Sequence, residues 1–260
     1  MLQVILSPAK TQREDEGLYD FGPQLFPEET ERLDQLLRAK TAQELQELWG
    51  VSEKLAAKTL ERYLASSLRR PQGTALGMYD GLVFKNLAPY VLDEAALDWL
   101  RSHLYIISGF YGLLRPDSAM SPYRLEMAAP LHIPATEDRA AAQDLYAYWG
   151  PRLARRAAEG CDCLVNLASE EYSKALRPHW PAEIPFLDLR FETERRDKEG
   201  QVQRRQITTR AKAARGRMLR FMAERQVESP EPLKDFCDEG FRYAEDSSSA
   251  SCYVFVQNVH

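Results

Sequence analysis

The chain has 260 residues, of which 44% are hydrophobic and 28% charged, and this composition is that of a globular protein. It contains no apolar run of about 18 residues, so the sequence predicts no membrane-spanning helix. The net charge is −5, but the segment 201–223 holds seven basic residues and no acidic one. Because the local field decides binding, the acidic whole-chain balance does not exclude a polyanionic partner.

Metal and disulfide chemistry receive little support from the sequence. The four cysteines are irregularly spaced, and although Cys161 and Cys163 lie two residues apart, no second ligand pair follows. The four histidines share no spacing. We therefore expect reduced, buried thiols, no metal site and no cofactor.

The first half of the chain alternates between apolar runs and helical periodicity. In chain order we expect a strand at 2–6, two helices within 27–68 divided at 49–52, a loop at 73–82, a helix at 93–102 and a strand at 104–107. A signal peptide is not expected, because the N-terminal residues lack a basic region and a cleavage site. They are predicted to be the first strand instead.

The second half continues the alternation. We expect a helix at 140–159, a strand at 161–167, a helix starting at Ser169, a hairpin of extended segments at 186–195 and 201–209, a helix at 211–226 and a strand at 252–256. Alternating strands and helices predict an α/β fold with a mixed sheet flanked by helices. No linker or repeat interrupts the chain, so residues 1–260 are predicted to form a single compact domain.

The segment 108–127 concentrates charges directly after an apolar strand. It holds Arg115, Asp117, Arg124 and Glu126 among glycines and prolines. Charged groups at the end of a buried strand are costly unless they pair or meet a ligand. The segment is therefore predicted to be a wall of a site.

Polar clusters follow other strands as well. Ligand crevices form outside the carboxyl ends of parallel strands, so these ends are expected to line one cleft. The expected cleft residues are Lys10, Arg115, Arg124, Glu126, Glu170 and Arg215. The alternative is that these side chains pair with each other in internal salt bridges.

The helix expected at 211–226 adds basic residues to this cleft. Its periodicity places Arg215 beside the apolar face, Lys212 one step further round and Arg220 toward solvent. Gly216 permits close approach of another backbone. We therefore expect Arg215 to reach inward.

An enzymatic role is left open. Ser7 and Lys10 fit Ser-x-x-Lys, but the partner motifs of penicillin-binding enzymes are absent. The cleft is expected to hold acids among its cations, and such acids could transfer protons. The candidate catalytic residues are Lys10, Glu126 and Asp246. This second hypothesis is an enzyme acting on an anionic, nucleotide-like small molecule.

Seven motifs, in order along the chain, resemble those of the YaaA family. They are SPAKT at 7–11, SGFYGLLRPD at 108–117, MSPYRLEM at 120–127, DLYAYWG at 144–150, NLASEEY at 166–172, AKAARGRM at 211–218 and EDSSS at 245–249. The resemblance implies a cytoplasmic bacterial protein of peroxide-stress resistance that helps limit free iron. It also implies an α/β fold with a positively charged cleft and a helix-hairpin-helix element that binds duplex DNA.

A candidate for the helix-hairpin-helix element lies at about 41–68. Its hairpin would be Trp49-Gly50-Val51-Ser52, with serine in place of the second glycine, followed by Lys54 and Lys58. Backbone N–H groups at such a helix start can bind a phosphate. The alternative is an ordinary helix–turn–helix connection capped by Ser52.

Duplex DNA, bound without sequence readout, is therefore the expected partner, with an anionic small molecule as the second possibility. The residues expected to bind DNA or another anion are Lys10, Lys54, Lys58, Arg115, Arg124, Lys212, Arg215 and Arg217.

Overall fold

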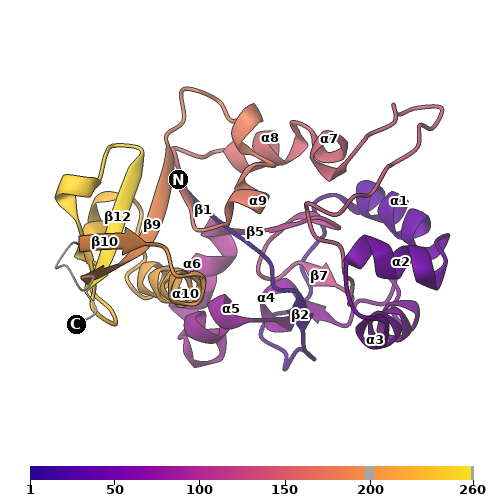
Figure 1. Ribbon diagram of the computed structural model, residues 1–260, viewed down its shortest axis with the longest axis horizontal. Helices are drawn as coiled ribbons and strands as arrows, with labels where there is room; N and C mark the ends of the chain where they lie inside the picture. Colours follow the sequence, from indigo (N-terminus) through magenta and orange to yellow (C-terminus); the bar gives the residue numbers. More distant parts are fainter. Residues whose placement is uncertain (197–201, 259–260) are drawn as a thin grey trace.

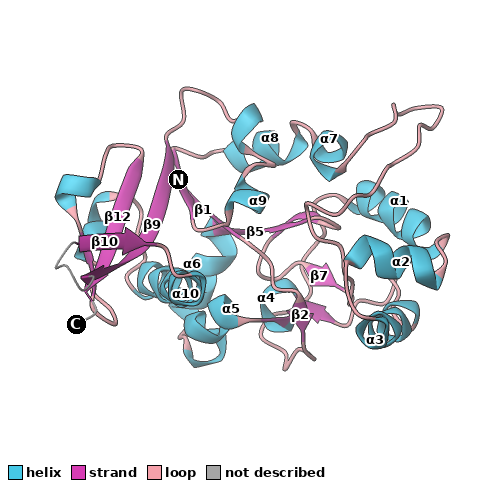
Figure 2. Ribbon diagram, in the orientation of Figure 1, coloured by secondary structure: helices cyan, strands magenta, loops and turns pink. Residues whose placement is uncertain are grey.

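A mixed β-sheet runs through the middle of the protein (Figures 1 and 2), in a computed structural model that describes residues 1–196 and 202–258. Among these residues eight strands form the sheet, in the order β11-β12-β9-β8-β1-β5-β6, with β10 paired to β9. The neighbours within β12-β9-β8-β1-β5 are parallel, whereas β6, β10 and β11 pair antiparallel.

The strands are short apart from β9 and β12. Their bounds are β1 (Leu2–Leu6), β2 (Thr11–Gln12), β3 (Gly73–Thr74), β4 (Tyr79–Asp80), β5 (Leu104–Ser108), β6 (Gly112–Leu114), β7 (Ala119–Met120), β8 (Cys163–Asn166), β9 (Phe186–Arg196), β10 (Val202–Arg205), β11 (Phe241–Tyr243) and β12 (Cys252–Asn258). Outside the main sheet, β2 pairs with β4 and β3 with β7.

Helices flank the sheet on both sides. The α-helices are α1 (Pro27–Arg38), α2 (Ala42–Trp49), α3 (Glu53–Leu64), α4 (Ala75–Met78), α5 (Leu82–Leu87), α6 (Glu94–His103), α7 (Leu145–Trp149), α8 (Arg152–Ala158), α9 (Glu170–Ser173) and α10 (Thr208–Glu224). Short 3₁₀ turns are η1 (Pro89–Val91), η2 (Arg177–His179), η3 (Glu231–Asp235) and η4 (Glu245–Ser247). In Figure 1, α7, α8 and α9 lie above the sheet, and α5, α6 and α10 lie below it.

Strand β1 lies at the centre because it is apolar and can pair on both edges. All five of its residues are buried, and Val4 faces Leu104 of β5 on one side and Val165 of β8 on the other. Strands buried on both faces are predominantly apolar, and four of the five residues of β1 are, the exception being Gln3. The predicted α/β fold with a mixed sheet and flanking helices is therefore confirmed.

Several element boundaries differ from the sequence-based prediction. The helix expected at 140–159 is two helices, α7 and α8, because Gly150 adopts a φ of 47° and Pro151 follows it. The loop expected at 73–82 contains β3, α4 and β4, which are too short to show a periodicity. The hairpin is confirmed by the antiparallel pairing of β9 with β10, although its connecting residues 197–201 lie outside the described part of the chain. Its second arm ends earlier than expected, since α10 begins at Thr208.

Helix α10 packs against α5 through a backbone approach that requires glycine. A Cβ atom at Gly216 would lie 2.1 Å from the carbonyl oxygen of Val83. Real Cβ atoms do not approach a backbone oxygen so closely, so any other residue forces the two helices apart. Because both helices line the cavity described below, this contact also sets the width of that cavity.

We predict that Gly216→Ala destabilises the protein by about 1–3 kcal/mol, because the added methyl group cannot be accommodated without a backbone shift. Helix propensity alone predicts the opposite sign, a gain of about 1 kcal/mol. Urea unfolding followed by circular dichroism measures the difference. Ala213→Gly on the same helix measures the effect of helix propensity alone on the free energy of unfolding. A Gly216→Ala variant more stable than the wild type would contradict the packing argument.

Candidate anion-binding cleft

The cleft begins where β1 and β8 end, because two serines hold the loops that leave these strands together. The Ser7 hydroxyl accepts a hydrogen bond from the backbone N–H of Ser169 at 2.8 Å, and the two side-chain oxygens are 3.2 Å apart. The loop after β8 is held further by Asn166, whose Oδ1 accepts from the N–H of Ala168 at 2.8 Å. The predicted convergence of these two strand ends is present.

The segment after β5 returns to the same place through a buried hydroxyl network. The Ser108 hydroxyl accepts from the N–H groups of Phe110 and Tyr111, at 3.1 and 2.9 Å, and donates to the Tyr123 hydroxyl at 2.8 Å. The Tyr79 and Tyr123 hydroxyls are 2.6 Å apart, and burial raises the Tyr123 pKa to about 12. The network fixes Tyr123 and therefore the position of the residues that follow it.

Glu126 binds two of the predicted cations. Its carboxylate lies 2.5 Å from Nζ of Lys10 and 3.2 Å from Nη2 of Arg124. For these three residues the salt-bridge alternative is therefore realised. Arg124 is only 14% exposed, and its Nε is buried without a hydrogen-bond partner among the described residues. This donor of Arg124 is therefore left unsatisfied by the described residues.

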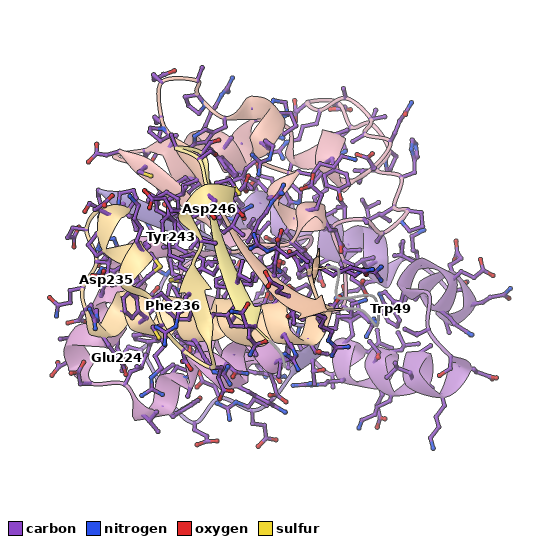
Figure 3. All side chains as sticks on the ribbon, turned by 60° about the vertical axis from the view of Figure 1, so that its left-hand side comes forward. Trp49, Glu224, Asp235, Phe236, Tyr243 and Asp246 are labelled. Atoms are coloured by element: carbon purple, nitrogen blue, oxygen red, sulfur yellow. The ribbon has the colours of Figure 1, made fainter. Side chains whose placement is uncertain are left out.

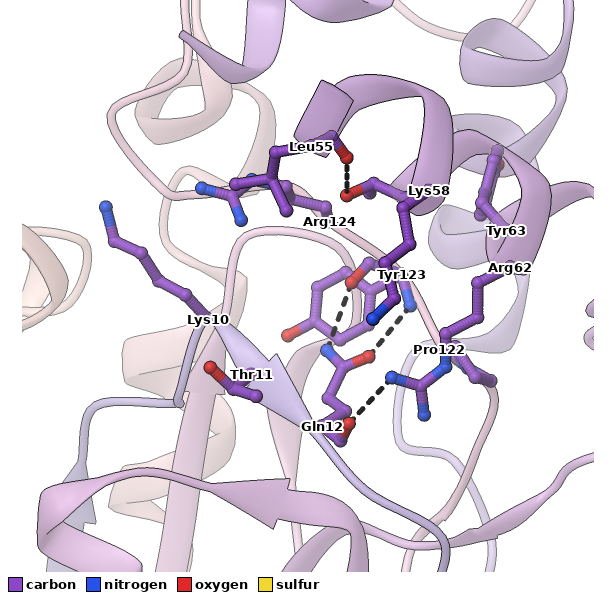
Figure 4. A pocket seen from close by; sticks show the side chains of 11 residues that line it. Lys10, Thr11, Gln12, Leu55, Lys58, Arg62, Tyr63, Pro122, Tyr123 and Arg124 are labelled. Atoms are coloured by element: carbon purple, nitrogen blue, oxygen red, sulfur yellow. Dashed lines mark hydrogen bonds between the residues drawn. The ribbon is translucent and has the colours of Figure 1, made fainter. Parts of the chain in front are cut away.

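A groove lies between α3 and this segment (Figure 4). This α3 groove, with a volume of about 290 Å³, is lined by residues 10–12, by one side of α3 between Leu55 and Tyr63, and by residues 122–124. Its charged lining residues are all cations: Lys10, Lys58, Arg62 and Arg124. Arg62 donates to the backbone oxygen of Gln12 at 2.6 Å, which holds α3 against β2.

A larger cavity lies on the other side of Lys10. It has a volume of about 560 Å³ and is formed by residues 7–11, by 80–84 around the start of α5, by residues between 167 and 172, and by one face of α10. Two cations of α10 line it, Lys212 and Arg215, as predicted from the helical periodicity. We call it the Arg215 cavity.

Arg215 has no ion pair or hydrogen bond with any residue in 1–196 or 202–258, and its Nε is buried. Burial lowers the pKa of its guanidinium. An arginine nevertheless stays protonated in a protein. On its other side Arg215 lines a further cavity of about 350 Å³, together with Glu170.

Three of the predicted site residues lie elsewhere. Strand β6 returns antiparallel to β5, so the residue after it is at the amino end of the sheet. There Arg115 stacks 3.6 Å above the Tyr105 ring and donates to Gln3 Oε1 and the Ser102 oxygen, both at 3.0 Å. Arg217 faces away from the Arg215 cavity and pairs with Asp238 and Glu239.

Asp246 is the third residue outside the cleft. It is exposed in η4 and lines neither the α3 groove nor the Arg215 cavity. Figure 3 shows it beside β12, far from Trp49 of α2. Asp246 does not reach the cleft because η4 connects β11 to β12, at the edge of the sheet beyond β9 and β8 from β1.

The turn between α2 and α3 leads directly into two cations of α3 that have no partner among the described residues. Gly50 ends α2 with a φ of 58°, and Ser52 precedes α3 with an ordinary φ of −64°, so serine is not strained there. No described side chain, including that of Ser52, accepts a hydrogen bond from the first N–H groups of α3. Lys54 and Lys58 are exposed and have no partner in the described chain. The helix-hairpin-helix identity of this turn stays a prediction.

Sequence reasoning missed Arg62 and Tyr172. Arg62 lies four residues after Lys58, which places both on one side of α3, and this spacing was a usable signal. Tyr172 lines the Arg215 cavity from α9. Its orientation depends on tertiary packing, so the sequence contained no comparable signal for it.

The described residues contain no cluster of three or more His, Cys, Asp or Glu side chains able to hold a metal ion. Cys161 and Cys163 are free and buried, and burial raises the Cys161 pKa to about 11. Cys237 is exposed, so the expectation of buried thiols fails for it. No helix within the described ranges is long and apolar enough to cross a membrane.

Residues 2–247 match the family described as "Peroxide stress protein YaaA". The chain belongs to this family. A relative named UPF0246 protein from Limosilactobacillus fermentum is 38% identical over 258 residues, which cover 99% of this chain and 100% of the relative. Another from Lacticaseibacillus paracasei is 36% identical, with 98% and 99% covered, and a third from Desulfitobacterium hafniense is 35% identical, with 98% of both covered.

Arg115 belongs to the motif at 108–117, and its substitution tests whether this arginine stabilises the fold or binds DNA. We predict that Arg115→Lys lowers the free energy of unfolding by about 1–3 kcal/mol, because lysine keeps the charge but loses the stacking and the forked donors. Urea unfolding measures this loss, and a filter-binding assay measures duplex affinity. Unchanged stability together with weakened duplex binding would contradict the placement of Arg115 at the amino end of the sheet.

Proposed function

We propose that this YaaA-family protein binds the phosphate backbone of duplex DNA in the cytoplasm, at the α3 groove and the adjoining α2–α3 turn. One observation carries the proposal: four cations line the α3 groove, and none of its lining residues is acidic. A groove lined by one sign of charge attracts a polyanion because its walls focus the field.

The unpaired lysines of α3 extend this surface. Lys54 and Lys58 lie one helical turn apart and are exposed, so both ammonium groups are accessible to phosphates. The first N–H groups of α3 are exposed at the start of the helix, and the helix dipole favours an anion there. Phosphate contacts of these two kinds position a protein on DNA.

Base-specific recognition is not part of the proposal. Sequence readout in the major groove needs an element that presents Asn, Gln and Arg side chains to base edges. The cations here lie in a groove and on a helix flank, and phosphate oxygens are their natural partners. Binding is therefore expected to be salt-dependent and insensitive to sequence.

The family description supplies the physiological setting, since peroxide chemistry damages DNA and a backbone-binding protein is suited to act on any sequence. Membership in the peroxide stress family supports this setting. An effect on intracellular free iron stays a prediction of the family resemblance.

Removing both free lysines of α3 tests the proposal. We predict that Lys54→Ala with Lys58→Ala weakens duplex binding roughly tenfold and lowers the slope of log K against log salt by about 2, one unit for each lost phosphate contact. Fluorescence anisotropy at several salt concentrations measures both quantities. Lys174→Ala with Lys234→Ala changes the net charge equally outside the groove, and an equal effect of that control would sink the assignment.

Glu126 gives a test with the opposite sign. We predict that Glu126→Gln strengthens duplex binding several-fold at low salt, because it releases the Lys10 and Arg124 cations from their shared carboxylate. The same anisotropy titration measures the gain. Glu224→Gln on α10 is the charge-matched control. Weaker binding by Glu126→Gln would mean that the carboxylate positions these cations for DNA.

A further inference from the structure

We propose that the Arg215 cavity binds the phosphoryl group of one nucleotide-sized ligand, at a site separate from the α3 groove. The central observation is Arg215 itself, a largely buried guanidinium without a partner in the described chain. A buried cation is costly unless an anion compensates it. A bound phosphoryl group would provide that anion, and its oxygens match the forked donors of arginine.

The guanidinium is held in place. Gly216, the next residue, lets the backbone of α10 lie directly against Val83 of α5, which places Arg215 at the wall of the cavity. The carboxylates of the 350 Å³ cavity on its other side are the competing partners, and they form no ion pair with it. One of them, Asp188, is already bound by Arg177 at 2.7 Å and by Asn166 at 2.8 Å.

Further donors face the same space. Lys212 lies on the α10 wall, exposed and without a partner in the described ranges, and Lys10 lies on the opposite wall. The hydroxyl-bearing residues Ser7, Ser169 and Thr208 also line the cavity. A tetrahedral anion with several acceptor oxygens fits this set of donors better than a single carboxylate does.

The remaining walls indicate what else the ligand carries. The volume of about 560 Å³ is in the range of small-molecule pockets. Phe84, Leu167 and Tyr172 provide apolar and aromatic surface for a flat ring. Asp80 and Glu171 also line the cavity, and they would repel additional phosphates while accepting hydrogen bonds from amino or hydroxyl groups. A mononucleotide fits these walls better than a polyphosphate.

Such a group has two possible sources with the same chemistry. It can be a free mononucleotide, or a single nucleotide rotated out of a duplex that lies in the α3 groove. The second source is geometrically reasonable because Lys10 lines both the groove and the cavity. The inference about the cavity holds for either source.

Calorimetric titration with AMP and dAMP tests the free source. We expect binding by the wild-type protein and an affinity at least about tenfold weaker for Arg215→Met, the effect of losing one charged hydrogen-bonding partner. Arg217→Met on the same helix removes an arginine outside the cavity and should bind normally. If Arg215→Met does not fold, Lys212→Gln replaces an exposed side chain of the same wall and should still weaken binding.

A duplex containing 2-aminopurine tests the second source, because this base brightens when it leaves the stack. Brightening with the wild-type protein that is lost in Arg215→Met, without AMP binding, would assign the cavity to a nucleotide of DNA. The inference is wrong if neither probe responds, or if Arg215→Met and Lys212→Gln behave as Arg217→Met does. Retained sensitivity of duplex affinity to the α3 lysines would then leave the proposed DNA binding standing.

Discussion

The parallel pairing of β1 on both of its edges is the constraint on which the rest of the structure depends. Five buried residues hold β1 between β5 and β8, so all three strands end at the same edge of the sheet. The loops that leave β1 and β8 at this edge carry Lys10 and Ser169, and the Tyr123 hydroxyl returns to Ser108 at the end of β5. The hydroxyl contact between Ser7 and Ser169 is possible because the register of the strands brings the ends of β1 and β8 together. A slip of one residue would turn the side chains of β1 to the other face of the sheet.

Charge placement around this edge follows two different patterns. On the α3 side, Glu126 compensates Lys10 and Arg124, so the cations are partly neutralised within the protein. On the α10 side, Arg215 has no such compensation among the described residues. The ion pairs of Glu126 stabilise the local structure. The uncompensated charge of Arg215, in contrast, would be stabilised by a bound anion. The two neighbouring cavities therefore differ in chemistry although they share a wall.

The sequence predicted those features that have a long-range periodicity or an apolar run. It located β1, β5 and α10, and it placed Lys212 and Arg215 correctly on one side of α10, because a 17-residue helix has several turns of pattern. It misplaced Arg115, since the three-residue strand β6 that reverses the chain has no recognisable periodicity. The volume of the Arg215 cavity was beyond prediction, because it depends on how closely two helices approach.

The position of Lys10 has a consequence for how the two cavities communicate. One ammonium group lines both spaces and is also the partner of Glu126. A single charge cannot fully neutralise an anion on each side at once, so a free nucleotide in the Arg215 cavity would lower the affinity of the α3 groove for a separate duplex. By thermodynamic linkage this antagonism is reciprocal and of equal size in both directions. If both proposed sites bind anions, the shared lysine would couple a free nucleotide and a separate duplex negatively, although the two ligands do not touch each other.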